Sequence, residues 1–215
     1  MKHASVQFMW SSELAYAVGL IATDGCLSKD GRHIDLTSND REQLINFMNC
    51  LGVLHPISSK QSGFSSSRSL HVQFSNVKLY RFLIDVGLTP KKSKSIGPID
   101  VPDHFFFDFL RGSFDGDGTF YSYHDPRWPK SFLLYTAFYS ASWRHLNWLQ
   151  SSIQRFIGII GHASKKPARS VYILRYAKKD SIALLRRIYK TGCNVRLARK
   201  YLKVKKAFAT MDIDL

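Results

Sequence analysis

The sequence of 215 residues has few cysteines, few acidic side chains and no long apolar run. Its three cysteines, Cys26, Cys50 and Cys193, lie far apart without a CxxC pair, which excludes a disulfide framework and a cysteine zinc site. The apolar stretch from Leu14 to Ala22 is far shorter than the roughly 18 residues that a membrane span needs. Because no signal-peptide cleavage site is recognisable either, we expect an intracellular protein in a reducing compartment.

The scarcity of acidic side chains leaves a strongly basic chain. Asp and Glu together number 16 against 31 Lys and Arg, and the net charge is +15. Residues 165–206 contain 15 basic side chains and one acidic side chain, a net charge of +14, together with apolar runs that indicate folded structure. This surplus predicts a polyanionic partner, either nucleic acid or an anionic membrane surface. The membrane ranks last because no basic amphipathic helix or lipidation signal supports it.

The hydrophobic pattern predicts the same order of elements twice. Helices are expected at 12–23, 40–51 and 77–86, with strands at 32–38 and 68–75, and then again at 103–115, 143–156 and 179–190, with strands at 131–140 and 169–176. A shift of 102 residues superposes the apolar stripe of 70, 72 and 74 on that of 172, 174 and 176. We therefore expect two similar halves, at 1–98 and 99–215, joined by a polar linker at 91–101.

A second shift, of 93 residues, superposes Asp24-Gly25 on Asp117-Gly118. The difference of nine residues between the two shifts predicts an insertion in a long loop around 124–129 of the second half. In both halves the Asp-Gly pair ends the first helix. A helix stop with glycine in the left-handed position is the simplest interpretation of one such pair, and its repetition favours a function.

Small residues predict that these two helices pack closely. Ala15, Gly19 and Ala22 form one stripe, and Gly112 and Gly116 are spaced to form the other. Packing about a pseudo-twofold axis would bring Asp24 and Asp117 to the same end. Two adjacent carboxylates need a cation between them, and oxygen ligands without a His or Cys cluster favour Mg²⁺ over zinc. Bound Mg²⁺ and a basic surface together indicate a nuclease.

The two helix ends carry a family resemblance. Ala-Val-Gly-Leu-Ile-Ala-Thr-Asp-Gly at 17–25 and Leu-Arg-Gly-Ser-Phe-Asp-Gly-Asp-Gly at 110–118 resemble the paired signature of the single-chain, two-motif LAGLIDADG homing endonucleases. The second copy is the more specific match, and the repeat extends the resemblance over essentially the whole chain. The resemblance implies an α+β fold of two αββαββα-like halves, whose antiparallel sheets form a saddle over the major groove of double-stranded DNA. It also implies a monomer that cleaves both strands with divalent metal and leaves 3′ overhangs.

The resemblance also implies roles for particular residues. The metal-binding acids of the family occupy the eighth motif position, here Asp24 and Asp117, and we add the seventh-position residues Thr23 and Gly116 to the metal site. The sixth position differs between the copies, Ala22 against Asp115, without consequence for the metal. A basic residue from each half is expected near the active site, within one or two positions of Lys92 and Lys200, to hold the attacking water or offset transition-state charge; a plain phosphate contact is the alternative role.

The remaining basic and polar side chains are candidates for reading DNA. Outward strand positions and the long loop are expected to contact bases or phosphates, and the final helix is expected to contact phosphates. The candidates are Arg32, Arg68, His71, Gln73 and Arg175 on the strands, Tyr121, Tyr123, Arg127 and Lys130 along the loop, and Lys203, Lys205 and Lys206 on the helix.

Two functions follow from these expectations. The first is a site-specific, Mg²⁺-dependent DNA endonuclease. The alternative is a non-cleaving nucleic-acid binder on the same fold, such as an intron RNA maturase or a transcription regulator. The two aspartates favour cleavage, because a simple binder has no need to keep two acids against phosphate repulsion.

Overall fold

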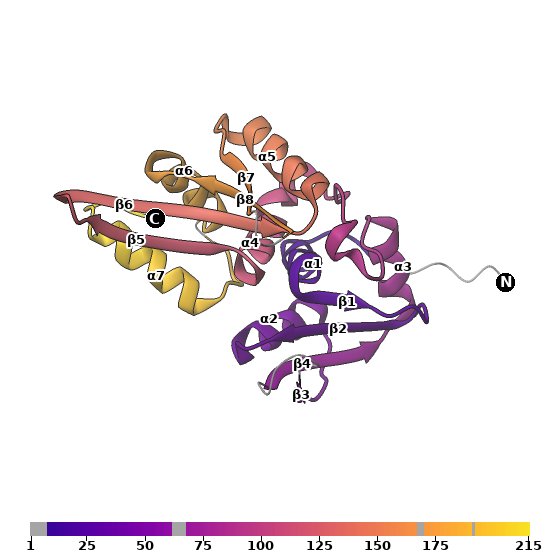
Figure 1. Ribbon diagram of the computed structural model, residues 1–215. Helices are drawn as coiled ribbons and strands as arrows, with labels where there is room; N and C mark the ends of the chain where they lie inside the picture. The colour runs from indigo at the N-terminus through magenta and orange to yellow at the C-terminus, as the bar shows by residue number, and fades with distance from the viewer. Residues whose placement is uncertain (1–7, 62–67, 167–169, 191) are drawn as a thin grey trace.

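The computed structural model describes residues 8–61, 68–166, 170–190 and 192–215, which form two halves with the same order of elements (Figure 1). The first half consists of α1 (Ser12–Asp24), β1 (Gly25–Leu27), β2 (His33–Ser38), α2 (Arg41–Leu51), β3 (Ser58–Gln61), β4 (Arg68–Ser75) and α3 (Val77–Asp85). The second consists of α4 (Phe106–Gly116), β5 (Thr119–Asp125), β6 (Trp128–Ser140), α5 (Trp143–Ile157), β7 (His162–Lys166), β8 (Val171–Tyr176) and α6 (Lys178–Ile188), followed by α7 (Ala198–Ala209). The predicted α+β fold of two αββαββα halves is confirmed.

Each half has a four-stranded antiparallel sheet, in the orders β1-β2-β4-β3 and β5-β6-β8-β7. Strand alternation gives each sheet two unlike faces. In β4, Val72 and Phe74 are buried, whereas Gln73 and Ser75 between and after them are exposed. Helices cover the apolar face of each sheet, and the other face stays open. None of the helices in the described ranges is both long and apolar enough to cross a membrane.

The two halves meet where α1 and α4 lie side by side at the centre of the molecule (Figure 1). A Cβ atom on Gly19 would lie 2.1 Å from the Phe109 carbonyl oxygen, and one on Gly112 would lie 2.1 Å from that of Tyr16. No side chain fits at either position, so the two backbones are in direct contact. The small-residue contact predicted from the sequence is therefore confirmed at Gly19 and Gly112.

The predicted long loop at 124–129 is wrong. Strands β5 and β6 instead form a long hairpin, in which only Pro126 and Arg127 lie between them. The buried carboxylate of Asp125 closes this turn by accepting from the Arg127 backbone N–H at 2.9 Å. Pro129 is tolerated in β6 because β8 pairs with that strand only at residues 136–140, so no second neighbour needs the missing N–H there. The extra residues lengthen two strands.

The start of the second half also differs from expectation. Asp103 does not cap a long helix; it lies in a 3₁₀ turn, Asp103–Phe105, before α4 begins at Phe106. Its carboxylate instead forms a two-point ion pair with the Arg155 guanidinium, at 2.6 and 2.7 Å. The pair fastens the entry to α4 against the end of α5.

The segment between the halves is packed rather than loose. Ile96 and Ile99 are buried, and two side chains of the α5 region hold the intervening backbone. The Ser142 hydroxyl donates to the Ile96 carbonyl at 2.6 Å, and His145 Nδ1 lies 2.7 Å from the Gly97 carbonyl, to which it donates. The Asp100 N–H also donates to the Val86 carbonyl of the first half at 2.9 Å, so the predicted polar linker is fixed against both halves.

We predict that Gly112→Ala lowers the free energy of unfolding by about 3 kcal/mol, because the added methyl meets the Tyr16 backbone, which cannot move aside without separating the helices. Urea unfolding measures the change. Gly97→Ala is the matched control, since its Cβ would meet only the flexible Arg144 side chain, at 3.1 Å. Equal losses in both variants would contradict the close contact.

We predict that His145 makes the fold less stable in mild acid. Burial lowers its pKa to about 4, whereas the unfolded chain binds this proton near pH 6.5. Stability is therefore fully present above about pH 6.5 and falls as the pH drops towards 4, by about 3 kcal/mol for this group. His145→Asn keeps a donor for Gly97 and should flatten the decline in urea unfolding between these pH values. An unchanged decline would show that His145 is not its cause.

Candidate active site

Asp24 and Asp117 end α1 and follow α4, at the same end of the helix pair. A Cβ on Gly116 would lie 2.0 Å from the Thr23 hydroxyl oxygen and 2.9 Å from Asp24 Oδ2. The tip of α4 therefore touches the tip of α1, and only a glycine allows this approach. The structure thus brings together the two acids that the sequence predicts to be paired.

The two carboxylates of the site repel each other electrostatically. Burial and the neighbouring charge of Asp117 raise the pKa of Asp24 to about 6. Burial also raises the pKa of Asp117, while the charges of Lys200 and Lys92 act to lower it. Two acids that repel and two cations beside them make a site suited to a phosphate and a small cation.

The two predicted lysines occupy equivalent positions in the halves. Lys92 lies in a 3₁₀ turn (Lys92–Lys94) after the first half, and its buried ammonium donates to the Gly25 carbonyl. Lys200, in the first turn of α7, donates to the Gly118 carbonyl at 2.7 Å. Gly25 and Gly118 are the same position of the two motifs. Burial lowers the pKa of both lysines to about 8.

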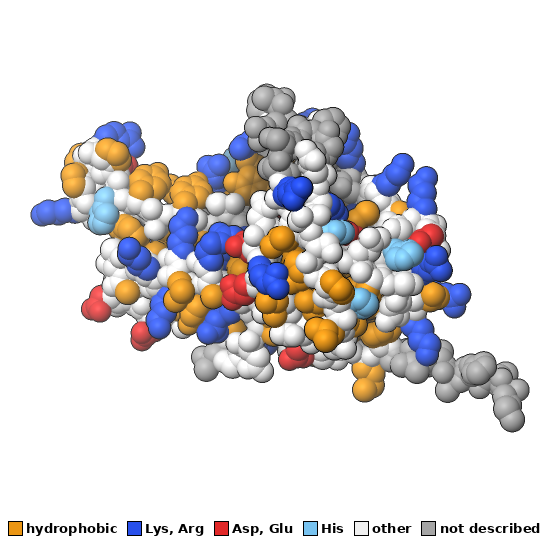
Figure 2. Space-filling model, turned by 90° about the horizontal axis from the view of Figure 1, so that it is seen from below, with side chains coloured by type: hydrophobic (Ala, Val, Ile, Leu, Met, Phe, Trp, Pro, Cys, Tyr) orange, Lys and Arg blue, Asp and Glu red, His pale blue; other side chains and the backbone are white. Residues whose placement is uncertain are grey.

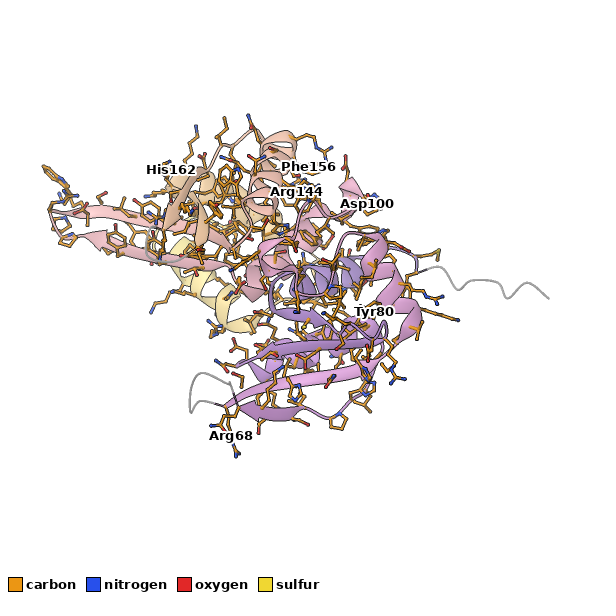
Figure 3. All side chains as sticks on the ribbon, turned by 45° about the vertical axis from the view of Figure 1, so that its right-hand side comes forward. Arg68, Tyr80, Asp100, Arg144, Phe156 and His162 are labelled. Atoms are coloured by element: carbon orange, nitrogen blue, oxygen red, sulfur yellow. The ribbon has the colours of Figure 1, made fainter. Side chains whose placement is uncertain are left out.

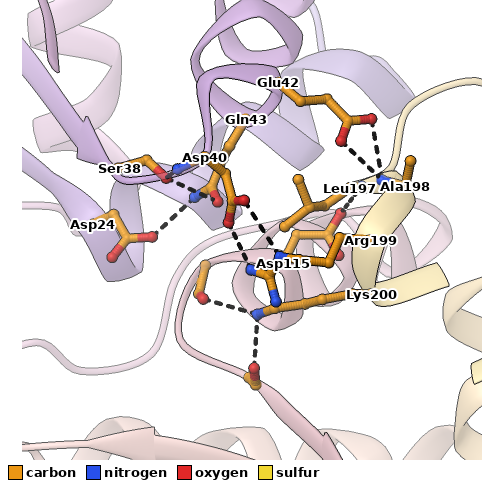
Figure 4. A network of polar contacts seen from close by, with 12 residues as sticks. Asp24, Ser38, Asp40, Glu42, Gln43, Asp115, Leu197, Ala198, Arg199 and Lys200 are labelled. Atoms are coloured by element: carbon orange, nitrogen blue, oxygen red, sulfur yellow. Dashed lines mark hydrogen bonds and ion pairs between the residues drawn. The ribbon is translucent and has the colours of Figure 1, made fainter. Parts of the chain in front are cut away.

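Gln43, a buried residue of α2, is a site residue that no sequence pattern predicts. Its Nε2 donates to Asp24 Oδ2 at 2.9 Å, and the Ser38 hydroxyl donates to its Oε1 at 3.3 Å (Figure 4). The 102-residue shift places His145 at the equivalent position, but that ring is turned to Gly97. Within the described residues, only Asp24 of the two acids receives a side-chain hydrogen bond.

Asp115 is fully buried between the halves, and its role is structural. It accepts from the Tyr16 hydroxyl at 2.8 Å and from the Leu197 backbone N–H at 2.7 Å (Figure 4 shows the second contact). Burial raises its pKa to about 6. Through Leu197 it fixes the start of α7, and therefore the position of Lys200.

A second set of contacts fastens α7 to the first half (Figure 4). The Glu42 carboxylate accepts from the Ala198 backbone N–H at 3.1 Å, where a negative charge suits a helix N-terminus. Asp40 accepts from the Arg199 guanidinium at 2.6 Å. Residues 198 and 199 thus bind α2 of the other half, and we call these contacts the α7 clamp.

Four groups are predicted to hold a hard cation: the two carboxylates, the Thr23 hydroxyl and the Gly116 carbonyl. The Thr23 hydroxyl donates to the Leu20 carbonyl at 3.0 Å, and the Gly116 carbonyl accepts from Lys200 at 2.9 Å. Each of these oxygens keeps a free lone pair, so Thr23 and Gly116 remain predicted ligands beside the two carboxylates. In the described ranges no cluster of three His, Cys, Asp or Glu is found. Two carboxylates suit Mg²⁺, which keeps several waters and takes further oxygens from phosphates.

The predicted DNA-contacting strand residues divide between the two faces of the sheets. His71 and Gln73 pair with Thr37 and Asp35 on the open face of the first sheet. Arg175, opposite Ala137, and the β5 residues Tyr121 and Tyr123 share the open face of the second. The predicted outward residues His71, Gln73 and Arg175 thus lie on an open face, whereas Tyr121 and Tyr123, predicted on a long loop, lie on strand β5 instead. Contact of these side chains with DNA remains a prediction.

Arg32 and Arg68 lie elsewhere, and their prediction as open-face residues is wrong. Arg68 has the same strand parity as Val72 and so belongs to the helix-covered side, at the exposed end of β4 (Figure 3). Arg32 precedes β2 in a turn, where it pairs with Asp30 at 3.6 Å and lines a hollow beside α3. The predicted alternation of β4 is correct, and Arg68 falls on the helix-covered side because it shares the even positions of Val72 and Phe74.

The remaining basic candidates are exposed around the second half. Arg127 lies in the hairpin turn, 3.2 Å from Asp125, and Lys130 follows at the start of β6. Lys203, Lys205 and Lys206 are on the outer side of α7, which runs along β5. Seen from below, basic side chains are spread over the surface with few acidic ones among them (Figure 2).

Comparison with known proteins identifies the fold. No protein-family model and no curated protein matches the sequence. Among solved structures, the homing endonuclease I-WcaI bound to its DNA recognition sequence matches 92% of this chain and 88% of its own, with a TM-score of 0.66 and 10% identity. The I-LtrWI LAGLIDADG homing endonuclease bound to target DNA matches 94% of this chain and 91% of its own, with a TM-score of 0.58 and 12% identity.

A third match is to a protein whose name does not describe it as an endonuclease. The N-terminal LAGLIDADG domain of DUF199/WhiA matches 87% of this chain and 85% of its own, with a TM-score of 0.54 and 18% identity. This chain covers 64% of full-length DUF199/WhiA from Thermatoga maritima. The class that the geometry defines is a two-motif α+β protein with paired acids between its halves. Its fold is the LAGLIDADG fold, as the sequence resemblance predicts.

We predict that Asp115→Asn lowers the free energy of unfolding by about 1–3 kcal/mol. Asp115 Oδ2 accepts from Tyr16 and Leu197, and Oδ1 accepts from the Tyr189 hydroxyl at 3.3 Å, so an amide nitrogen in place of either oxygen leaves a buried donor without an acceptor. Urea unfolding tests this. Asp103→Asn is the control, because that exposed acid bonds only to an exposed arginine and its loss should change little. Comparable losses from the two substitutions would rule out the structural role of Asp115.

Proposed function

We propose that this protein is a site-specific DNA endonuclease that cleaves both strands of a duplex with divalent metal, Mg²⁺ by the chemistry of its ligands. The observation that carries the proposal is the convergence of Asp24 and Asp117 at the contact of two pseudo-symmetric halves, with Lys92 and Lys200 beside them. The similarity to I-WcaI and I-LtrWI supports the same conclusion, because both were solved bound to DNA.

The residues of the site have separate roles in this proposal. Asp24 and Asp117 hold the metal, which when bound polarises the phosphoryl oxygens and lowers the pKa of a coordinated water. Lys92 and Lys200 face the same space as the acids and offset the charge that develops on the phosphate. Gln43 is a positioning residue, since its hydrogen bond fixes the Asp24 carboxylate.

The arrangement of the halves matches the symmetry of the substrate. A duplex has a local twofold axis between its strands, and the pseudo-twofold axis between α1 and α4 gives each strand one aspartate and one lysine. The open faces of the two sheets extend on either side of the acids and offer two long surfaces for the groove. We therefore propose a monomer that binds a long double-stranded site, in a compartment that contains DNA.

A non-cleaving nucleic-acid binder on this fold is the second candidate. The similarity to the WhiA domain is close in TM-score to that of I-LtrWI, so the fold by itself does not choose between the two functions. The two acids and two buried lysines favour cleavage, because four desolvated charged groups are costly to keep for binding alone.

We predict that Asp24→Asn and Asp117→Asn each abolish double-strand cleavage while DNA binding survives, because each removes a metal ligand and leaves the phosphate-binding surface intact. Cleaved sites are first selected from a randomised duplex library with Mg²⁺, and each variant is then tested for cleavage and binding. Asp103→Asn, far from the site, is the control and should cleave normally. Full cleavage by both single variants, or no cleavage of any duplex by the unmodified protein, would refute the endonuclease proposal.

A further inference from the structure

A strip of three tyrosines lies on the open face of the second sheet. Tyr121 and Tyr123 come from β5 and Tyr135 comes from β6, directly opposite Tyr121. The ring centroids of Tyr121 and Tyr135 are 5.1 Å apart and tilted by 23°, and those of Tyr121 and Tyr123 are 6.4 Å apart and tilted by 8°. We call these three residues the tyrosine strip. Hydrophobic side chains line the arm at the left of Figure 2, which is the β5–β6 hairpin.

The strip continues directly from the candidate active site. Strand β5 begins at Thr119, two residues after Asp117, and the strip follows on the same face. Cations border it: Arg175 lies close enough to act on the Tyr121 hydroxyl, and the Lys166 ammonium is 5.9 Å from the ring centroid of Tyr139, further along β6. A surface with an apolar centre and cationic edges suits the floor of a major groove between two phosphate backbones.

The orientation of the rings restricts what they can contact. The rings are nearly parallel and packed against one another, so their faces are partly covered and their edges remain accessible. Tyr123 is 43% exposed. Covered faces cannot stack on unpaired bases, which favours a duplex over a single strand. Ring edges instead suit small apolar groups, and the thymine C5-methyl is the apolar group that the major groove presents.

The open face of the first sheet has a different chemistry. At its centre Asp35 accepts from Lys60 at 2.8 Å and from Thr37 at 3.0 Å, and it lies 2.7 Å from the His71 ring nitrogen. This cluster offers hydrogen-bonding groups, and its one ring, the His71 imidazole, is polar and bonded to Asp35. The two halves therefore present unlike surfaces to the two ends of a bound site.

We propose that the tyrosine strip reads thymine methyl groups in the half-site bound by the second half of the protein, whereas the first half reads its half-site through hydrogen bonds. The proposal rests on the duplex DNA binding proposed above. Tyr121 and Tyr123 lie four and six residues past Asp117, or about 13 and 20 Å along a strand. With the strand running along the groove, these distances place the contacted thymine methyl groups about four to six base pairs from the cleaved phosphate.

Deoxyuridine, which lacks only the methyl group, tests this directly. Duplexes of the selected site are made with deoxyuridine for thymine in one half-site at a time, and affinity is measured with Ca²⁺ in place of Mg²⁺. We expect each replacement four to six base pairs into the second half-site to weaken binding about threefold to fivefold. The same replacement in the first half-site should have little effect.

Two variants of an exposed ring connect the effect to the strip. Tyr123→Ser should bind thymine and deoxyuridine sites equally, because the apolar edge is gone, whereas Tyr123→Phe keeps the ring and should keep the discrimination. Equal sensitivity of the two half-sites, or discrimination that survives in Tyr123→Ser, would overturn the strip proposal and leave the endonuclease proposal standing. A protein that binds no duplex would overturn both.

Discussion

The contact between the backbones of α1 and α4 is the constraint on which the rest of the structure depends. Gly19 and Gly112 let each helix reach the carbonyl groups of the other. The distance between the motif ends, and so the repulsion between Asp24 and Asp117, follows from that contact. Because the helices leave the contact at the same end, the two sheets that follow them open to the same side.

The polar groups around the site form a frame built from both halves. Asp115 lies within the helix pair and fixes the start of α7, while Gln43 reaches from α2 to Asp24. Burying these polar groups costs free energy, and this cost is offset only where each group has a hydrogen-bond or ion-pair partner. The contacts of the frame provide those partners. The frame is not symmetric: Gln43 supports one acid, and its counterpart His145 supports the interdomain segment instead.

Local sequence patterns predict the motif helices and the paired acids, because each depends on spacing within one element or on the repeat, whereas the two lysines follow from the family resemblance. Long-range contacts were missed for a physical reason. Gln43 meets Asp24 across 19 residues and Asp115 meets Leu197 across 82, and no local pattern encodes either pair. The nine-residue difference between the two repeat shifts suggested a long loop at 124–129, but pairing between strands determined the hairpin. Arg68 was misplaced because it shares the even positions of the buried Val72 and Phe74 and so belongs to their side of β4.

The α7 clamp has a consequence for how the protein is made. Its acids, Asp40 and Glu42, are synthesised early, whereas their partners at 198 and 199 and the adjacent Lys200 emerge from the ribosome about 150 residues later. A nascent chain that has completed only its first half carries Asp24 without its opposing acid, its second lysine or the helix that supplies it. Assembly of the site from both halves therefore waits for translation to pass α7.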